Sequence, residues 1–191
     1  MTAERATYFC VDIECNGPVP GLYDMVSLAA VRVVPDADGA LQADASLTLY
    51  ARPTAPRFDA RAAAIHGLDQ SWLSSEGLEQ GAFCEELSRW VAAQTLSGTE
   101  PVFVGHNAPF DWSFVAWVFA NQGLPNPFGY KALCTKALAT GVLGVHWLDS
   151  GKETLCKLLQ LPPEDHSQKH DALYDARYQA EILIRLLQRS A

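Results

Sequence analysis

The chain has 191 residues, of which 49% are hydrophobic and 19% are charged, as in an ordinary folded protein of one domain. This balance excludes a disordered chain, and the formal net charge of −8 argues against a protein that coats nucleic acid through many phosphate contacts. We therefore expect one domain over residues 1–191, with no membrane span and, in the absence of a signal-peptide pattern, a cytoplasmic location.

The first fifty residues are typical of an antiparallel β-meander. Residues 8–13 and 25–34 are apolar runs with β propensity, and the stretch 17–21 between them is rich in glycine and proline. Turn-forming residues at 36–39 precede residues 41–50, which alternate loosely between apolar and polar. The pattern predicts three consecutive strands.

Helical patterns begin near residue 60. They cover residues 60–65, 81–94, 154–159 and 172–187, and in the last of these apolar residues recur at steps of three and four. Such a helix has one apolar face that can pack on a sheet. Strands followed by alternating helices and strands predict a mixed α/β sheet with helices packed on it.

A strand-to-helix unit lies in the middle of the chain. Residues 101–104 form a short apolar run, Asn107 is a candidate N-cap, and Pro109 fits the first turn of an apolar helix that ends near Gly123. Asp111 then lies in the first helical turn, where an acid is favoured by the helix dipole alone. The residue types of the preceding loop, which include glycine, histidine and asparagine, also fit a functional site.

Two acids share one face of the first strand. Asp12 and Glu14 flank Ile13, so both carboxylates point to the side opposite to Ile13. Their mutual repulsion requires a cation, a proton or solvent. An exposed strand end would satisfy them with water, whereas a site at the end of the strand would use Mg²⁺ or Mn²⁺.

A histidine and two acids surround the start of the last helix. His170 and Asp175 are five residues apart, which is about 140° on a continuous helix, so we expect His170 on the preceding loop. Asp175 then faces the site from the early helical turns. Asp171 competes for the same role, although an acid at the helix start is also explained as a cap.

Three motifs, taken in order, resemble those of the DEDDh (DnaQ-like) 3′-5′ exonucleases, which include proofreading subunits, RNase T and oligoribonuclease. The motifs are D-I-E at 12–14, G-H-N-A-P-F-D at 105–111 and H-D-A-L-Y-D-A at 170–176, and the segment 64–68 resembles a loop common in that family. The resemblance covers most of the chain. It implies an RNase H-like fold, namely a mixed five-stranded sheet with helices on both faces.

The resemblance also implies a mechanism. Asp12, Glu14, Asp111 and Asp175 would hold two divalent ions, Mg²⁺ or Mn²⁺, and His170 would be the general base. The spacing of the third motif selects Asp175 over Asp171. The expected reaction is hydrolysis at the 3′ end of single-stranded RNA or DNA, which releases nucleoside 5′-monophosphates. The alternative is an inactive nucleic-acid-binding or scaffold module of the same fold.

By similarity, seven further residues would bind the terminal nucleotide: Ile13, Cys15, Asn16, His66, His106, Asn107 and Phe110. Cys15 departs from the family pattern, in which threonine often follows the glutamate. The change removes a hydroxyl group but leaves the backbone amide, so we expect altered specificity rather than inactivity. By analogy with free-standing relatives, we also expect a homodimer.

Overall fold

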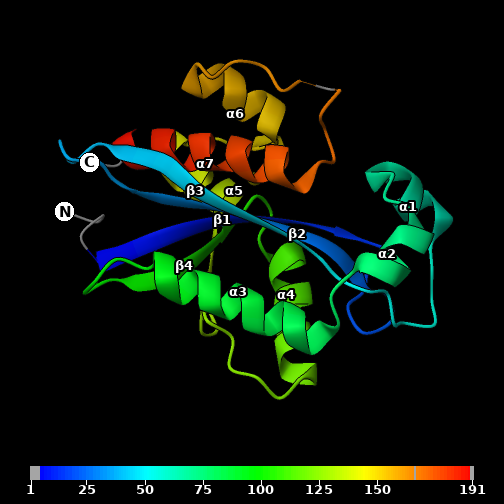
Figure 1. Cartoon of the computed structure of the whole chain (residues 1–191). Coiled ribbons are helices and arrows are strands. Elements are labelled where there is room, and N and C mark those ends of the chain that lie inside the picture. Colours follow the sequence, from blue (N-terminus) through cyan, green and yellow to red (C-terminus); the bar gives the residue numbers. More distant parts are fainter. Residues whose placement is uncertain (1–4, 166, 190–191) are drawn as a thin grey trace.

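The computed structural model describes residues 5–165 and 167–189 and is built on a mixed five-stranded sheet in the order β3-β2-β1-β4-β5 (Figure 1). Strands β1, β2 and β3 form the antiparallel meander, and β4 and β5 run parallel to β1. The strands are β1 (Ala6–Cys15), β2 (Met25–Pro35), β3 (Leu41–Tyr50), β4 (Glu100–Gly105) and β5 (Ala132–Cys134). The predicted sheet is confirmed. The residue pattern did not reveal β5, because three residues are too few for a periodicity.

Helices cover both faces of the sheet, as the resemblance implied (Figure 1). Helices α3 and α4 lie on one face, α7 lies on the other with α5 and α6 around it, and α1 and α2 lie beyond one end of the sheet. The helices are α1 (Ala60–His66), α2 (Gln70–Glu76), α3 (Gln80–Gln94), α4 (Pro109–Asn121), α5 (Thr135–Leu143), α6 (Lys152–Leu159) and α7 (Ala172–Arg189), with a 3₁₀ turn at Trp147–Asp149. Among the described residues, no helix has the length and apolar character needed to cross a bilayer.

The alternation of side chains along β1 sets the position of the acids. Phe9 and Ile13 belong to the hydrophobic core that α3 and α4 close, whereas Tyr8 and Cys10 pack against α7 on the opposite face. Alanines at the start and middle of α7 are fully or almost fully buried there, which allows the helix to approach the sheet closely. Beyond Cys10, the α7 face of the strand continues with Asp12 and Glu14.

The loop between β4 and α4 differs from the prediction. Asn107 is not the N-cap of α4, because the helix begins at Pro109 and Ala108 takes the cap position without a side-chain hydrogen bond. Asn107 instead has φ = 69°, a left-handed conformation that asparagine tolerates better than most residues. Its carbonyl oxygen accepts a hydrogen bond from the Phe110 N–H, which closes a tight turn.

Candidate active site

The two acids of β1 lie where the strand leaves regular pairing with β2. The register shifts between Glu14 and Cys15, an irregularity that often occurs beside active sites. Asp12 faces α7, and its Oδ1 accepts a hydrogen bond of 2.6 Å from Nε2 of Gln179. Glu14 is 9% exposed, so its carboxylate is not the solvated group of an exposed strand end.

Asp111 reaches the same strand from the first turn of α4. Its Oδ1 accepts a hydrogen bond of 3.2 Å from the N–H of Ile13, the residue between the two acids. The side chain is buried, with 6% of the residue exposed. A purely capping acid would lie in solvent at the helix end, whereas Asp111 joins a helix and a strand that are 98 residues apart in the sequence.

Asp175 and His170 meet Glu14 from the start of α7. His170 lies on the preceding turn, as expected, with φ = 69° and its N–H bound to Oδ2 of Asp175 at 2.9 Å. One potential ligand atom from each of these three residues lies within 4.8 Å of the others. Asp171 accepts a hydrogen bond from the N–H of Tyr174 and is exposed, which is the cap role that was the alternative to a ligand role.

The electrostatics of the acids reflect this crowding. Burial, followed by the charge of Asp111, raises the pKa of Asp12 well above its ordinary value. Burial, with the charges of Asp175 and Asp111, raises the pKa of Glu14 to about 8. Burial also raises the pKa of Asp111, although hydrogen bonds and Lys152 oppose the change. The ionised forms of these acids are thus unfavourable in a space with little water, and a bound cation would stabilise them.

Two residues of the site were not predicted from the sequence. Lys152, the first residue of α6, forms an ion pair with Asp175, and its ammonium group lies 3.7 Å from Glu164. Burial lowers the pKa of Lys152, but the charges of Asp12 and Asp175 outweigh this and raise it. A single lysine at a helix start carries no spacing signal. Gln179 could have been found, since it follows Asp175 by four residues and so lies on the same helix face.

A cleft of about 690 Å³ opens beside the acids. All five predicted catalytic residues line it, and so do Ile13, Cys15, His106, Asn107 and Phe110 from the predicted nucleotide-binding set. Phe110 is 38% exposed, which leaves part of its ring free to stack on a base. The His106 ring is bound to Thr135 at 2.9 Å, and burial with the charge of Lys152 lowers its pKa to about 3, so it is neutral.

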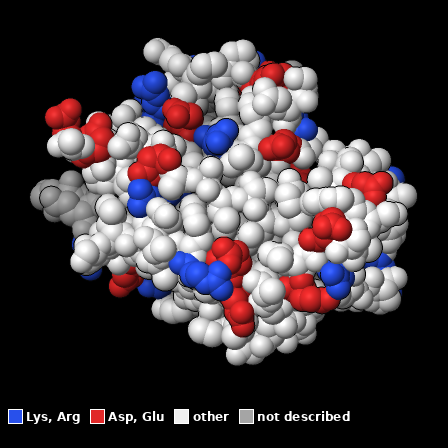
Figure 2. All heavy atoms as spheres, in the orientation of Figure 1, with Lys and Arg blue, Asp and Glu red and all other residues white. Residues whose placement is uncertain are grey.

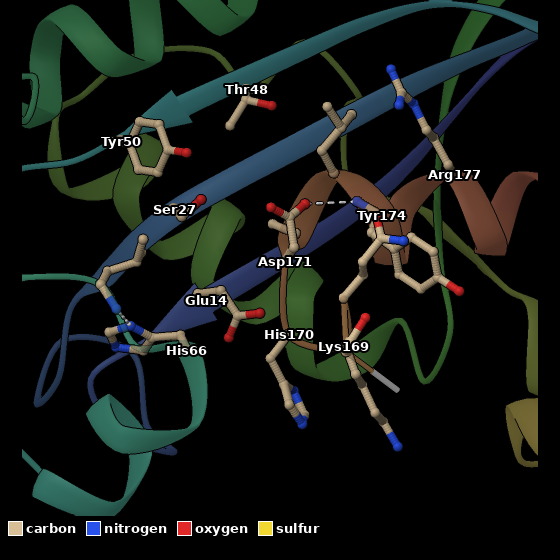
Figure 3. Close-up of a pocket in the computed structure, with 15 residues that line it drawn as sticks. Glu14, Ser27, Thr48, Tyr50, His66, Lys169, His170, Asp171, Tyr174 and Arg177 are labelled. Carbon is tan, nitrogen blue, oxygen red and sulfur yellow. Dashed lines mark hydrogen bonds between the residues drawn. The ribbon is translucent and has the colours of Figure 1, made fainter. Parts of the chain in front are cut away.

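The other two predicted nucleotide-binding residues do not line this cleft. Asn16 is 2% exposed, and its Oδ1 is 3.2 Å from Nε2 of His66, while its amide group donates to Gln70. His66 lines a neighbouring cavity of about 590 Å³, which shares Glu14 and His170 with the cleft (Figure 3). The structure thus brings His66 to the edge of the site and gives Asn16 a supporting position.

The neighbouring cavity extends from the acids along the sheet. Thr48 and Tyr50 of β3 line one side of it, and Lys169 and Arg177 lie on the other (Figure 3). Elsewhere, on the face drawn in Figure 2, Lys and Arg side chains are scattered among Asp and Glu. The surface in this view therefore has no extended basic area that would bind a long stretch of nucleic acid.

Comparison of the sequence with known proteins gives consistent matches. The sequence model of the RNase T family, described as exonuclease, matches residues 9–183. The 3′-5′ DNA exonuclease Cap18 of Escherichia coli is 33% identical over 189 residues, which cover 99% of this chain and 95% of that protein. Ribonuclease T of Pectobacterium atrosepticum is 28% identical over 184 residues, with 94% and 80% covered.

Solved structures share the fold at low sequence identity. The nuclease domain of 3′hExo, a DEDDh family member bound to rAMP, superposes with a TM-score of 0.76 at 13% identity and covers 97% of this chain and 92% of that domain. Escherichia coli exonuclease I in complex with a dT13 oligonucleotide gives a TM-score of 0.69 at 20% identity, covering 96% of this chain and 41% of that one.

Proposed function

Because the chain belongs to the RNase T family of DnaQ-like 3′-5′ exonucleases, we propose that it removes nucleotides one at a time from the 3′ end of a single strand. The products are nucleoside 5′-monophosphates and a strand shortened by one residue. One observation carries the proposal: Asp12, Glu14, Asp111, His170 and Asp175, from three distant segments, line the same cleft.

The acids fit a pair of divalent cations. Lys152 is the cation that lies among the four carboxylates, and its one positive charge does not balance them when all four are ionised. Carboxylate oxygens are the ligands that Mg²⁺ and Mn²⁺ prefer. Asp12, Glu14, Asp111 and Asp175 would hold two such ions, which when bound polarise the phosphate and lower the pKa of a bound water.

His170 supplies the proton acceptor. Its imidazole is exposed at the cleft edge beside Glu14, and the hydrogen bond from the backbone N–H of His170 to Asp175 fixes the turn on which the residue lies. The ring takes a proton from the attacking water as the new phosphorus–oxygen bond forms. The bond from phosphorus to the 3′-oxygen breaks, and that oxygen takes a proton from solvent water to give the new 3′-hydroxyl end, while His170 releases its proton to solvent.

The cleft and its neighbouring cavity suggest the path of the strand. The terminal nucleotide occupies the cleft beside Phe110, and the preceding nucleotides pass Glu14 and His170 into the second cavity. Lys169 borders both spaces and can contact a backbone phosphate. We propose DNA as the preferred strand, because the more similar of the two relatives described above is a DNA exonuclease, although RNA is the substrate named for the other.

The rival proposal is an inactive binding or scaffold module of the same fold. Such a module would have lost part of its ligand set, whereas all four acids and the histidine are present and line one cleft. A role in binding nucleic acid through many phosphate contacts also draws no support from the net charge of −8.

The test is digestion of 5′-labelled single-stranded DNA and RNA oligomers with Mg²⁺, Mn²⁺ or EDTA. We expect stepwise shortening with either ion, faster for DNA, and none in EDTA. Asp12→Ala should lower the rate at least about a hundredfold, while Asp38→Ala, an exposed acid in a turn, should not change it. Equal digestion by wild type and Asp12→Ala would refute the assignment, and faster loss of RNA would reverse the substrate preference.

A further inference from the structure

Lys152 places a buried cation among the carboxylates of the site. Its ammonium group is paired with Oδ1 of Asp175, and the side chains of Lys152 and Asp175 are 16% and 6% exposed. Asp12 also attracts this charge. This ion pair is largely shielded from solvent. Removal of one partner would therefore leave the other charge uncompensated.

Glu164 lies on the other side of the same ammonium group. Its side chain is 7% exposed, and its Oε1 is 3.7 Å from Nζ of Lys152, which is too far for a hydrogen bond. Within residues 5–165 and 167–189, this buried oxygen has no hydrogen-bond partner. A buried acceptor without a donor is unfavourable, so a hydrogen bond from the Lys152 ammonium group would stabilise Glu164.

We propose that Lys152 is a built-in counter-ion, which neutralises Asp175 while the site lacks metal and moves to Glu164 when a divalent ion binds. The inference rests on the proposed function, because it takes Asp175 as a metal ligand. A dication at Asp175 repels the ammonium group, and Glu164 offers it a second carboxylate outside the four proposed ligands. Metal binding is thus coupled to movement of the Lys152 ammonium group from Asp175 to Glu164.

Substitutions of Lys152 and of Glu164 should change the affinity for metal in opposite directions. Lys152→Met removes the competing cation, so Mn²⁺ should bind about tenfold more tightly. The same variant should unfold at a lower temperature in EDTA, because the acids lose their only buried ammonium neighbour among the described residues. Glu164→Gln removes the acid that receives Lys152, so Mn²⁺ should bind about tenfold more weakly.

The measurement is the unfolding temperature of the full chain in EDTA and over a Mn²⁺ titration, which gives both the metal-free stability and the dissociation constant. Lys157→Met is the matched control. This lysine is on the same helix and is 72% exposed, so its loss changes the net charge equally without touching the site. We expect it to leave Mn²⁺ affinity unchanged. In a Lys152→Met background, Glu164→Gln should no longer weaken Mn²⁺ binding.

Weaker or unchanged Mn²⁺ binding in Lys152→Met would overturn the inference. If that variant does not fold, Glu164→Gln decides alone, and unchanged affinity there would overturn it equally. A wild-type protein whose unfolding temperature does not respond to Mn²⁺ would overturn the metal-dependent function as well. If the wild type responds to Mn²⁺ but the affinities of the variants do not change in the predicted directions, only the inference about Lys152 fails.

Discussion

Gln179 connects two parts of the site without carrying charge. Its Nε2 donates to Asp12 at 2.6 Å, and its Oε1 accepts the N–H of His106 at 3.0 Å. The residue is 1% exposed, so neither contact can be replaced easily by water. Asp12 therefore has one oxygen fixed toward α7, and its orientation depends on a residue that the motifs did not identify.

Replacement of Gln179 by leucine should lower both stability and turnover. The change leaves a buried carboxylate oxygen and a backbone N–H without partners, at a cost of about 1–3 kcal/mol in the free energy of unfolding. Urea unfolding in EDTA and single-turnover digestion of a DNA oligomer measure the two effects. Gln188→Leu, on an exposed position of the same helix, should leave both unchanged. Wild-type turnover in Gln179→Leu would show that Asp12 does not need this contact.

The metal-free protein should lose stability as pH rises from about 5 to about 8. An acid with a pKa raised by folding stabilises the protein fully below its unfolded pKa, and that stability is lost as pH rises through the folded pKa. For Glu14 the window extends from its ordinary value of 4.5 to about 8. Urea unfolding in EDTA should give a smaller slope against pH for Glu14→Gln than for wild type. A wild-type stability that rises across this window would contradict the crowded acids.

At the scale of elements, the segments predicted from the sequence were those with a long apolar periodicity. The three strands of the meander and the apolar faces of α3 and α7 have periodicities long enough to identify. Helix α2 has seven residues, of which Leu73 is buried, and strand β5 has three residues. Neither segment is long enough for a periodicity, so tertiary contacts determine the structure of both. The turn at Asn107 was assigned wrongly because a left-handed residue and an N-cap share the same preference for asparagine.

The turn between β4 and α4 also explains why residue 105 is a glycine. A Cβ atom there would lie 2.9 Å from Cα of Ala108, so Gly105→Ala must push the start of α4 away. We expect a loss of about 1–3 kcal/mol in the free energy of unfolding and slower digestion, because Asp111 moves with the helix. Gly141→Ala is the control with the opposite sign. That site in α5 has open space, and alanine should stabilise the helix by about 0.5–1 kcal/mol.

At the scale of the whole molecule, the site exists because the sheet order brings distant segments together. The parallel pairing of β1 with β4 places the end of one strand beside the helix that follows the other, and α7 crosses the face on which the acids of β1 lie. The ordered motifs were enough to select five residues that line one cleft, and their catalytic roles stay a prediction. They could not predict Lys152 or Glu164, because the contact between α6 and the loop before α7 depends on packing that no local pattern encodes.

Calorimetric titration of Mn²⁺ into the wild type and Asp111→Asn tests most directly whether these segments form one metal site. We predict two ions per wild-type chain and loss of at least one in Asp111→Asn, while Asp38→Asn, on an exposed turn, binds as wild type does. A wild-type chain that binds no Mn²⁺, or an Asp111→Asn variant that binds both ions with unchanged affinity, would contradict the account.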